Sequence, residues 1–135
     1  MKSLFLCVYF GFLCVYPVFA EEPHLIDLKE TLCMDADSST AGMANCTKDA
    51  EVAWDQEMNK YYGLLMKRLN KEQADKLLQA QRAWLEYRDK EFKNIGVLFS
   101  DKEGTMWIPV RSAHYRDIVK QRALELAEYY CLLGY

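Results

Sequence analysis

The sequence predicts an all-α fold, a small antiparallel three-helix bundle with an N-terminal disulfide-closed turn. Apolar residues recur at three- and four-residue steps over most of the chain, as they do along the buried face of a helix. No segment alternates β-branched and polar residues as a strand would. With 51% hydrophobic residues, three prolines and six glycines, the composition is that of a globular domain and not of a disordered chain.

Residues 1–20 have the pattern of a secretory signal peptide. A positive start precedes an almost wholly apolar run at residues 4–15, which is too short for a stable membrane span. We expect cleavage after Ala20 and export to the periplasm or the medium. A leucine precedes both Cys7 and Cys14, where a lipid-bearing cysteine requires a small residue, so a lipoprotein is disfavoured.

Cleavage after Ala20 leaves 115 of the 135 residues, about the size of one ordinary domain. The signal removes only Lys2 from the charge count, so the net charge changes from −3 to −4. An acidic exported domain argues against a nucleic-acid partner and suits a basic one.

Three cysteines remain after export, and the oxidising compartment makes them candidates for a disulfide. Cys33 and Cys46 flank a short polar turn at residues 35–40, which can bring them together, and we expect this pair to be bonded. In the chain-entropy model such a loop contributes about 3 kcal/mol. Cys131 lies far along the chain, predicted at the opposite end of the bundle, and is either free or links two chains in a homodimer.

Residues 21–38 show no sustained period and are predicted to form an N-terminal arm, with a turn of helix as an option at residues 25–31. The first long helix has two candidate caps, Thr40 and Thr47, so it begins before Cys46 or just after it. Its apolar face comprises Ala50, Trp54, Met58, Tyr61, Leu65 and Leu69.

A capping box, with Asn70 as the cap and Gln73 reaching back, predicts the start of the second long helix. Gly96 is the expected stop, followed by a loop at residues 97–105. The third helix tolerates Pro109 near its start. The inner face of the second helix comprises Leu77, Gln81, Trp84, Leu85, Arg88, Phe92 and Ile95. The inner face of the third helix comprises Ile108, Tyr115, Ile118, Val119, Arg122 and Leu126.

The densest stretch of the chain, residues 78–92, raises the question of whether it builds a site or joins helices. Trp84 and Arg88 share one helical face with Gln81. Large aromatic residues at helical spacing usually pack in a core. We therefore interpret Trp84 as a core residue and Arg88 as the partner of a carboxylate or carbonyl from a neighbouring helix.

The run AQRAWLEYRDKEF at residues 80–92 resembles the AQxxWxxYRdxeC motif of the LprI-like family, whose namesake is a mycobacterial lysozyme inhibitor. Further segments agree in order, so that the resemblance spans residues 33–130. They are Cys33 to Cys46 with Thr40 and Met43 between, residues 55–62, residues 104–109, and Arg122 with Leu126.

This resemblance implies a helical LprI-like domain at residues 39–135. It also implies an exported, non-covalent inhibitor of lysozymes or other peptidoglycan-cleaving enzymes of the bacterial envelope. The residues that match the family motif are interpreted as mainly structural: Asp55, Asn59, Tyr62, Gln81, Trp84, Arg88 and Arg122.

The chain departs from the family pattern at three positions. Many relatives have cysteines where this chain has Phe92 and His114, which indicates that a second disulfide has been lost as a pair. An apolar contact of Phe92 is expected in its place, and His114 is interpreted as an exposed or hydrogen-bonded helix residue. The family pattern does not predict Cys131.

The sequence does not favour an enzyme. After export only His24 and His114 remain as histidines, and we place His24 in the mobile arm. No HExxH, GxSxG, P-loop or paired CxxC pattern occurs, and most carboxylates stand beside lysine or arginine as solvated charges do. We therefore expect no catalytic residues, no cofactor and no metal site.

A binding protein needs a rigid scaffold that presents a surface to its partner. The candidate surface is the interior loop, where polar side chains can contact a basic cleft and aromatic ones can anchor. Its residues are Phe99, Ser100, Asp101, Glu103 and Trp107. Two alternatives stay open: the loop is a solvated connection, or the protein is a structural module of the cell envelope with no lysozyme target. In the second case Cys131 and the aromatic tail (Tyr129, Tyr130, Tyr135) would form a self-association edge.

Overall fold

Four helices, not the three predicted, make up the described part of the computed structural model, residues 22–134. They are α1 (Leu25–Ala36), α2 (Thr40–Arg68), α3 (Lys71–Leu98) and α4 (Trp107–Leu132). These residues include no strand, so the all-α class is confirmed and the helix number is corrected. The predicted signal peptide lies outside the described residues.

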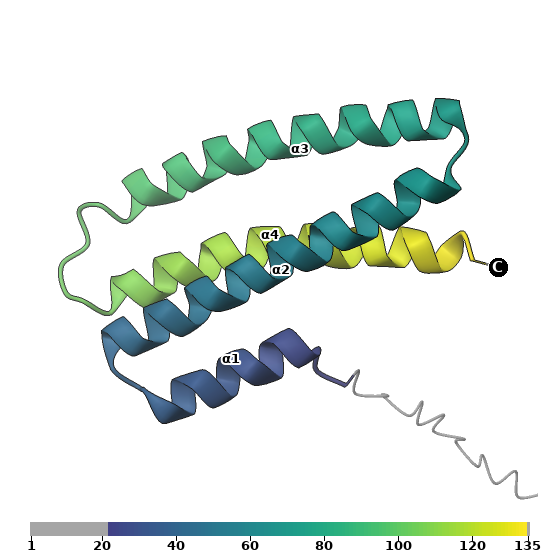
Figure 1. Cartoon of the computed structure of the whole chain (residues 1–135). Coiled ribbons are helices and arrows are strands. Elements are labelled where there is room, and N and C mark those ends of the chain that lie inside the picture. Colours follow the sequence, from purple (N-terminus) through teal and green to yellow (C-terminus); the bar gives the residue numbers. More distant parts are fainter. Residues whose placement is uncertain (1–21, 135) are drawn as a thin grey trace, which may run out of the picture.

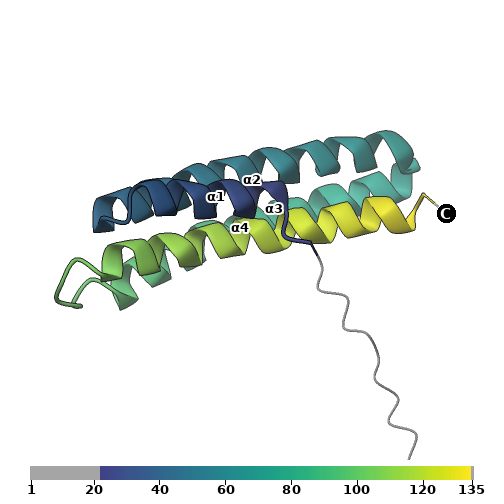
Figure 2. The ribbon, with the colours of Figure 1, turned by 90° about the horizontal axis from the view of Figure 1, so that it is seen from below.

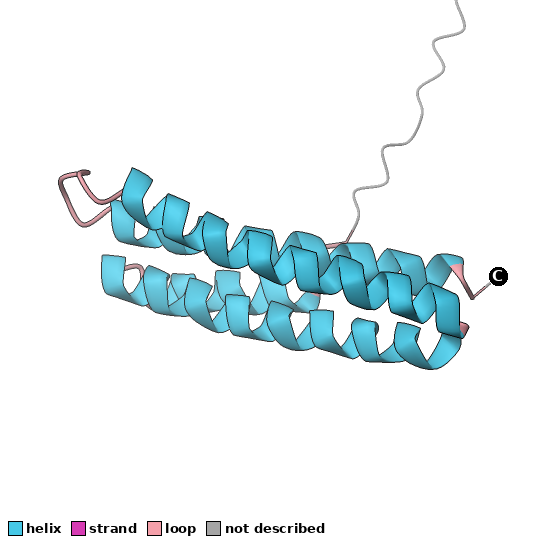
Figure 3. Ribbon diagram, turned by 90° about the horizontal axis from the view of Figure 1, so that it is seen from above, coloured by secondary structure: helices cyan, strands magenta, loops and turns pink. Residues whose placement is uncertain are grey.

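The helices form three layers. α2 and α4 run parallel to each other in the middle, while α1 and α3 run antiparallel to them on opposite sides of the pair (Figures 1 and 2). The loop between α3 and α4 projects from one end of the bundle (Figure 3). The core is the seam of the central pair and consists of Trp54, Met58 and Leu65 from α2 with Val119, Ala123 and Leu126 from α4.

Helix α1 occupies most of the segment that we predicted as an arm. Its cap is His24, whose Nδ1 accepts a hydrogen bond from the backbone N–H of Ile26 at 3.2 Å. The helix directs a buried acid, Glu30, inward to an ion pair with Arg116 of α4. The usual amphipathic pattern is therefore inverted, because an acid is buried and leucines are exposed. For this reason the sequence of the segment shows no amphipathic period. Its exposed residues include Leu25, Leu28 and Leu32.

A short turn joins α1 to α2, and the predicted disulfide between Cys33 and Cys46 closes it. Asp37 accepts a hydrogen bond from the backbone N–H of Ser39, and hydrogen bonds from Ser39 lower the pKa of that carboxyl. The Ser39 hydroxyl caps α2 in turn. Helix α2 therefore begins at Thr40, before the second cysteine, which is the earlier of the two predicted starts.

The start of α3 is as predicted, and its end is not. Asn70 and Gln73 form both hydrogen bonds of the capping box, at 2.9 and 3.0 Å. The helix continues past Gly96 to Leu98, so the prediction of Gly96 as the stop is wrong. Gly96 does not have the positive φ of a terminating glycine. Pro109 lies in the first turn of α4, where no N–H partner is needed.

Candidate functional site

The residues of the family motif join α3 to the central pair, first through a buried link to α4. Arg122, only 8% exposed, donates from Nε to Oε1 of Gln81 at 2.9 Å. Gln81 directs its Nε2 at the sulfur of Met58, 3.6 Å away. Arg122 also pairs with Glu125 on its own helix. One amino group of this guanidinium, Nη2, is buried without a partner.

A second link, nearer the surface, joins α3 to α2. Arg88 lies 3.8 Å from the carboxylate of Asp55 and 2.8 Å from that of Asp89. Asn59 donates to the same Asp55 carboxylate at 3.0 Å. The Arg88 guanidinium lies 5.7 Å from the centre of the Trp84 ring. Since this group is partly exposed, solvent weakens its ion pairs relative to the buried link.

Trp84 and Tyr62 pack partly buried against the core, whereas the fully buried tryptophan is Trp54 of α2. We predicted both tryptophans on inner helical faces; Trp54 is central in the core, and Trp84 packs against it partly buried. The motif side chains contact other parts of this chain and each other. The contacts of Gln81 with Arg122 and of Arg88 with Asp55 join different helices.

The predicted partner-binding loop spans residues 99–106 between α3 and α4. Phe99 and Trp107 lie at its two ends with their ring centres 5.7 Å apart, and both are half-buried. They therefore pack on each other rather than projecting as free anchors. Asp101 and Glu103 are exposed, and Ser100 donates to Asp101 at 3.2 Å.

Exposed apolar side chains flank this loop, and the sequence did not predict them as surface residues. Val97 and Leu98, at the end of α3, are 72% and 62% exposed. Met106 and Ile108, at the start of α4, are 62% and 43% exposed. We predicted Ile108 on the inner face of its helix, which is wrong. An apolar surface thus borders the two exposed acids of the loop.

Phe92 and His114, where the resemblance implies cysteines in many relatives, contact different aromatic partners. Phe92 stacks on Tyr115, with ring centres 4.5 Å apart, and the Tyr115 hydroxyl donates to the backbone oxygen of Phe92 at 3.3 Å. His114 is exposed and lies 5.6 Å from the Phe99 ring. The aromatic contact between α3 and α4 is thus made by Phe92 with Tyr115. The other histidine, His24, which we placed in the arm, caps α1 and lies against Trp54 with ring centres 4.4 Å apart.

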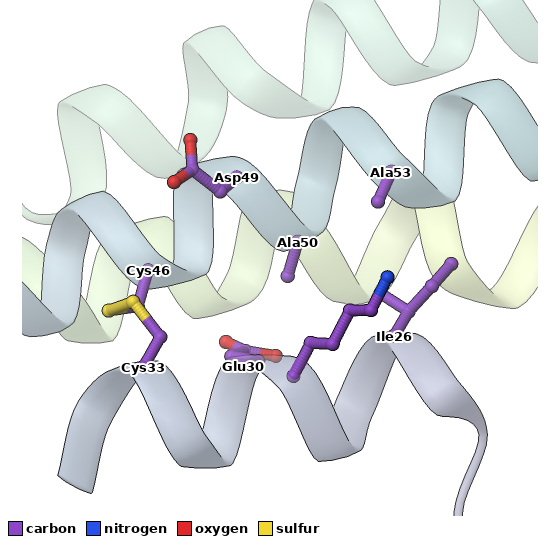
Figure 4. A pocket seen from close by; sticks show the side chains of 8 residues that line it. Ile26, Glu30, Cys33, Cys46, Asp49, Ala50 and Ala53 are labelled. Carbon is purple, nitrogen blue, oxygen red and sulfur yellow. A yellow bond between two sulfur atoms is a disulfide. The ribbon is translucent and has the colours of Figure 1, made fainter. Parts of the chain in front are cut away.

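A small cavity of about 250 Å³ lies between α1 and α2 beside the disulfide. Figure 4 shows Cys33 and Cys46 at one end of it and Glu30 between the two helices. Ala50 and Ile26 supply apolar walls. Because Glu30 is already paired with Arg116, its charge is compensated from outside the cavity.

Within residues 22–134, no three His, Cys, Asp or Glu side chains are arranged to hold a metal ion. No helix in the same part of the chain is long and apolar enough to cross a membrane. Cys131 is exposed near the end of α4, at the opposite end of the bundle from the disulfide. Cys131 is a free cysteine in this structure, so the alternative of a homodimer linked through it gains no support.

Comparisons with known proteins agree with the predicted resemblance. A family model described as "Lysozyme inhibitor LprI" matches residues 33–126. The crystal structure of an uncharacterised protein from Burkholderia thailandensis is similar with a TM-score of 0.79 and 25% sequence identity. That match covers 84% of this chain and 57% of the other, so this chain spans little more than half the length of that protein. No curated protein matches the chain.

Proposed function

This chain belongs to the family of the lysozyme inhibitor LprI, and we propose that it is an exported protein that inhibits a lysozyme or another peptidoglycan-cleaving enzyme by non-covalent binding. Family membership over residues 33–126 is the observation that carries the proposal. The disulfide is consistent with export. The family's description as inhibitors is consistent with our expectation that the chain is not an enzyme.

The loop end of the bundle is the proposed contact surface. Asp101 and Glu103 are exposed there, and acidic groups complement a basic cleft and accelerate its approach. The exposed flanks, Val97 and Met106, supply apolar area around these charges. In this proposal Phe99 and Trp107 support the loop, and Val97 and Met106 make the apolar contacts with the partner.

The scaffold beneath the loop supports this role because it limits the conformational entropy that the loop loses on binding. The stacked rings of Phe99 and Trp107 join its two ends, and Lys102 lies 5.5 Å from the centre of the Trp107 ring. Helices α3 and α4 fix the direction of the loop. A loop that is already ordered loses less conformational entropy when its partner binds.

An inhibition assay tests the proposal. We expect the chain from residue 21 onward to slow lysis of a cell-wall suspension by at least one lysozyme class, with folding verified by circular dichroism. The double variant Asp101→Asn/Glu103→Gln should weaken inhibition about tenfold, most clearly at low salt. The matched control is Glu72→Gln/Asp75→Asn, which removes two exposed acids at the opposite end of α3.

If the folded protein at large molar excess inhibits none of several lysozyme classes, the inhibitor function is wrong. The alternative, a cell-envelope interaction module without a lysozyme target, then takes its place. Inhibition that the loop variant leaves unchanged would retain the function and move the contact surface elsewhere.

A further inference from the structure

A groove of about 470 Å³ runs between the second half of α3 and the first half of α4. From α3 its lining includes Tyr87, Glu91 and Leu98. From α4 the lining includes Asp117 and Ile118. The groove reaches the loop end of the bundle, because Leu98 is the last residue of α3.

Large apolar side chains stand open along this groove. Tyr87 is 53% exposed and Leu98 is 62% exposed, three helical turns apart on α3. Ile95, between them and 6% exposed, closes the floor. Exposed apolar groups gathered around a recess are typical of a surface that a partner covers.

The charge of the groove is acidic. Glu91 and Asp117 line it, and its lining includes no lysine or arginine. Asn94 donates to Oε1 of Glu91, and Arg116 donates to Oδ1 of Asp117. No hydrogen bond among residues 22–134 uses the second oxygen of either carboxylate, so both remain able to accept.

The cavity on the other side of α3 differs because its lining includes an arginine. There Arg88 stands between Asp55 and Asp89, so the acids that line that cavity are paired with a cation of this chain. In the groove between α3 and α4, Glu91 has no cation partner among residues 22–134, and Arg116 divides its single charge between Asp117 and the buried Glu30. The groove therefore combines open apolar area with a net negative charge. Its complement is therefore a cation carried on an apolar stem or beside apolar residues.

We propose that this groove receives an arginine- or lysine-bearing apolar segment of the partner enzyme, as a second contact surface beside the loop. The inference rests on the proposed function and names the chemistry of the partner at this site. The cationic head lies between Glu91 and Asp117, and the apolar part packs on Tyr87 and Leu98. Leu98 belongs to both surfaces, so a single partner can cover the groove and the loop together.

Substitutions in the groove test this site against the inhibited enzyme. Leu98→Ala and Tyr87→Ala should each raise the dissociation constant about tenfold, and Glu91→Gln should raise it several-fold at low salt. All three side chains lie at or near the surface, so thermal unfolding should stay close to wild type. Matched controls are Leu32→Ala, which removes a leucine 68% exposed on α1, and Glu86→Gln on α3, and both should bind within twofold of wild type. Groove variants that inhibit as well as wild type would overturn the proposal while leaving the inhibitor function intact.

A peptide titration tests the groove without any lysozyme. Acetyl-Leu-Arg-Leu-amide at millimolar concentration should shift the backbone NMR signals of residues 87–98 and 114–121. Acetyl-Leu-Glu-Leu-amide should not. Absence of these shifts overturns the groove even if lysozymes are inhibited. Shifts in a protein that inhibits no lysozyme would support the groove and contradict the proposed function.

Discussion

The central pair α2–α4 and the outer helix α3 are held by different kinds of interaction. Among residues 22–134, nine apolar side chains are buried, and only Ile95 of these belongs to α3, although that helix is 28 residues long. The other eight lie on α2 and α4. Helix α3 packs only partly buried side chains, such as Trp84, against the core. It is attached further by the hydrogen bond of Gln81 with Arg122, the ion pair of Arg88 with Asp55, and the stacking of Phe92 on Tyr115.

This difference teaches what the family motif contributes. Apolar burial is non-directional and stabilises the central pair wherever the area is large. Hydrogen bonds and ion pairs are directional, so Gln81 and Arg88 set where α3 lies even though the helix buries little. A helix held at a few points leaves recesses beside it, and the acidic groove between α3 and α4 is one of them.

The largest effect that separates the two regions is expected from their tryptophans. Trp54→Ala should destabilise the fold by about 3–5 kcal/mol, which is most of the stability of a small domain, because Trp54 is fully buried. Trp84→Ala removes a partly buried ring and should cost about 1–2 kcal/mol. Urea denaturation followed by circular dichroism measures both.

Hydrogen exchange sharpens the same comparison. In Trp84→Ala, amide exchange should accelerate mainly in α3, because this helix opens with little loss of buried area. Uniform acceleration across α2, α3 and α4 would show that the outer helix and the pair unfold as one unit.

The buried link between α3 and α4 should give the next largest effect. Gln81→Leu leaves Nε of Arg122 without its acceptor and should cost about 2–3 kcal/mol. Arg122→Met leaves Oε1 of Gln81 without its donor and should cost a similar amount. In the double variant both polar groups are replaced by apolar ones, so its loss should be clearly smaller than the sum of the two. Additive losses in denaturation would mean that the two side chains act independently.

Substituting two glycines of α2 by alanine should change the stability by smaller amounts and in opposite directions. A Cβ added at Gly63 meets nothing within 4 Å, so Gly63→Ala should stabilise the helix by about 0.5–1 kcal/mol. A Cβ at Gly42 would overlap the carboxylate of Asp37, which receives a hydrogen bond from Ser39 in the turn before α2. Gly42→Ala should therefore yield no gain or a loss of about 1 kcal/mol.

A second substitution separates the overlap with Asp37 from the gain in helix propensity at Gly42. In an Asp37→Ala background the overlap is absent, so Gly42→Ala should stabilise as Gly63→Ala does. The measurement is the melting temperature of the wild type, Gly42→Ala, Asp37→Ala and the double variant. A gain at Gly42 in the wild-type background would contradict the overlap.

The sequence predicts the central helices well because their signals are local. Trp54, Met58 and Leu65 recur at helical spacing and all are buried, and the capping box at Asn70 depends only on residues three positions apart. The disulfide between Cys33 and Cys46 follows from a short polar turn. These features need no knowledge of the neighbouring helices.

The outer elements were predicted less well because their burial and contacts depend on neighbouring helices. Glu30 of α1 is buried only because Arg116 of α4 faces it, so the apolar pattern that marks a helix was inverted. Phe99 and Trp107 were expected to face a partner, and instead they pack on each other across the loop. The groove beside Leu98 depends on the separation of two helices, which no single segment of the sequence specifies.

The smallest expected effect concerns pH at the end of α4. The hydrogen bond from the Tyr129 hydroxyl lowers the pKa of Glu125, Arg122 lowers it further, and burial opposes both. A lowered carboxyl pKa contributes stability that is present above the unfolded value of about 4.3 and is lost as pH falls through the folded value. Tyr129→Phe should thus be less stable than wild type by under about 1 kcal/mol at pH 7, since solvent screens this group, and the difference should disappear once the pH has fallen through the lowered pKa of Glu125. Tyr87→Phe, whose hydroxyl makes no hydrogen bond among residues 22–134, should show no such pH dependence in parallel melts. A difference for Tyr129→Phe that persists unchanged into acid would assign the effect to packing and not to the charge of Glu125.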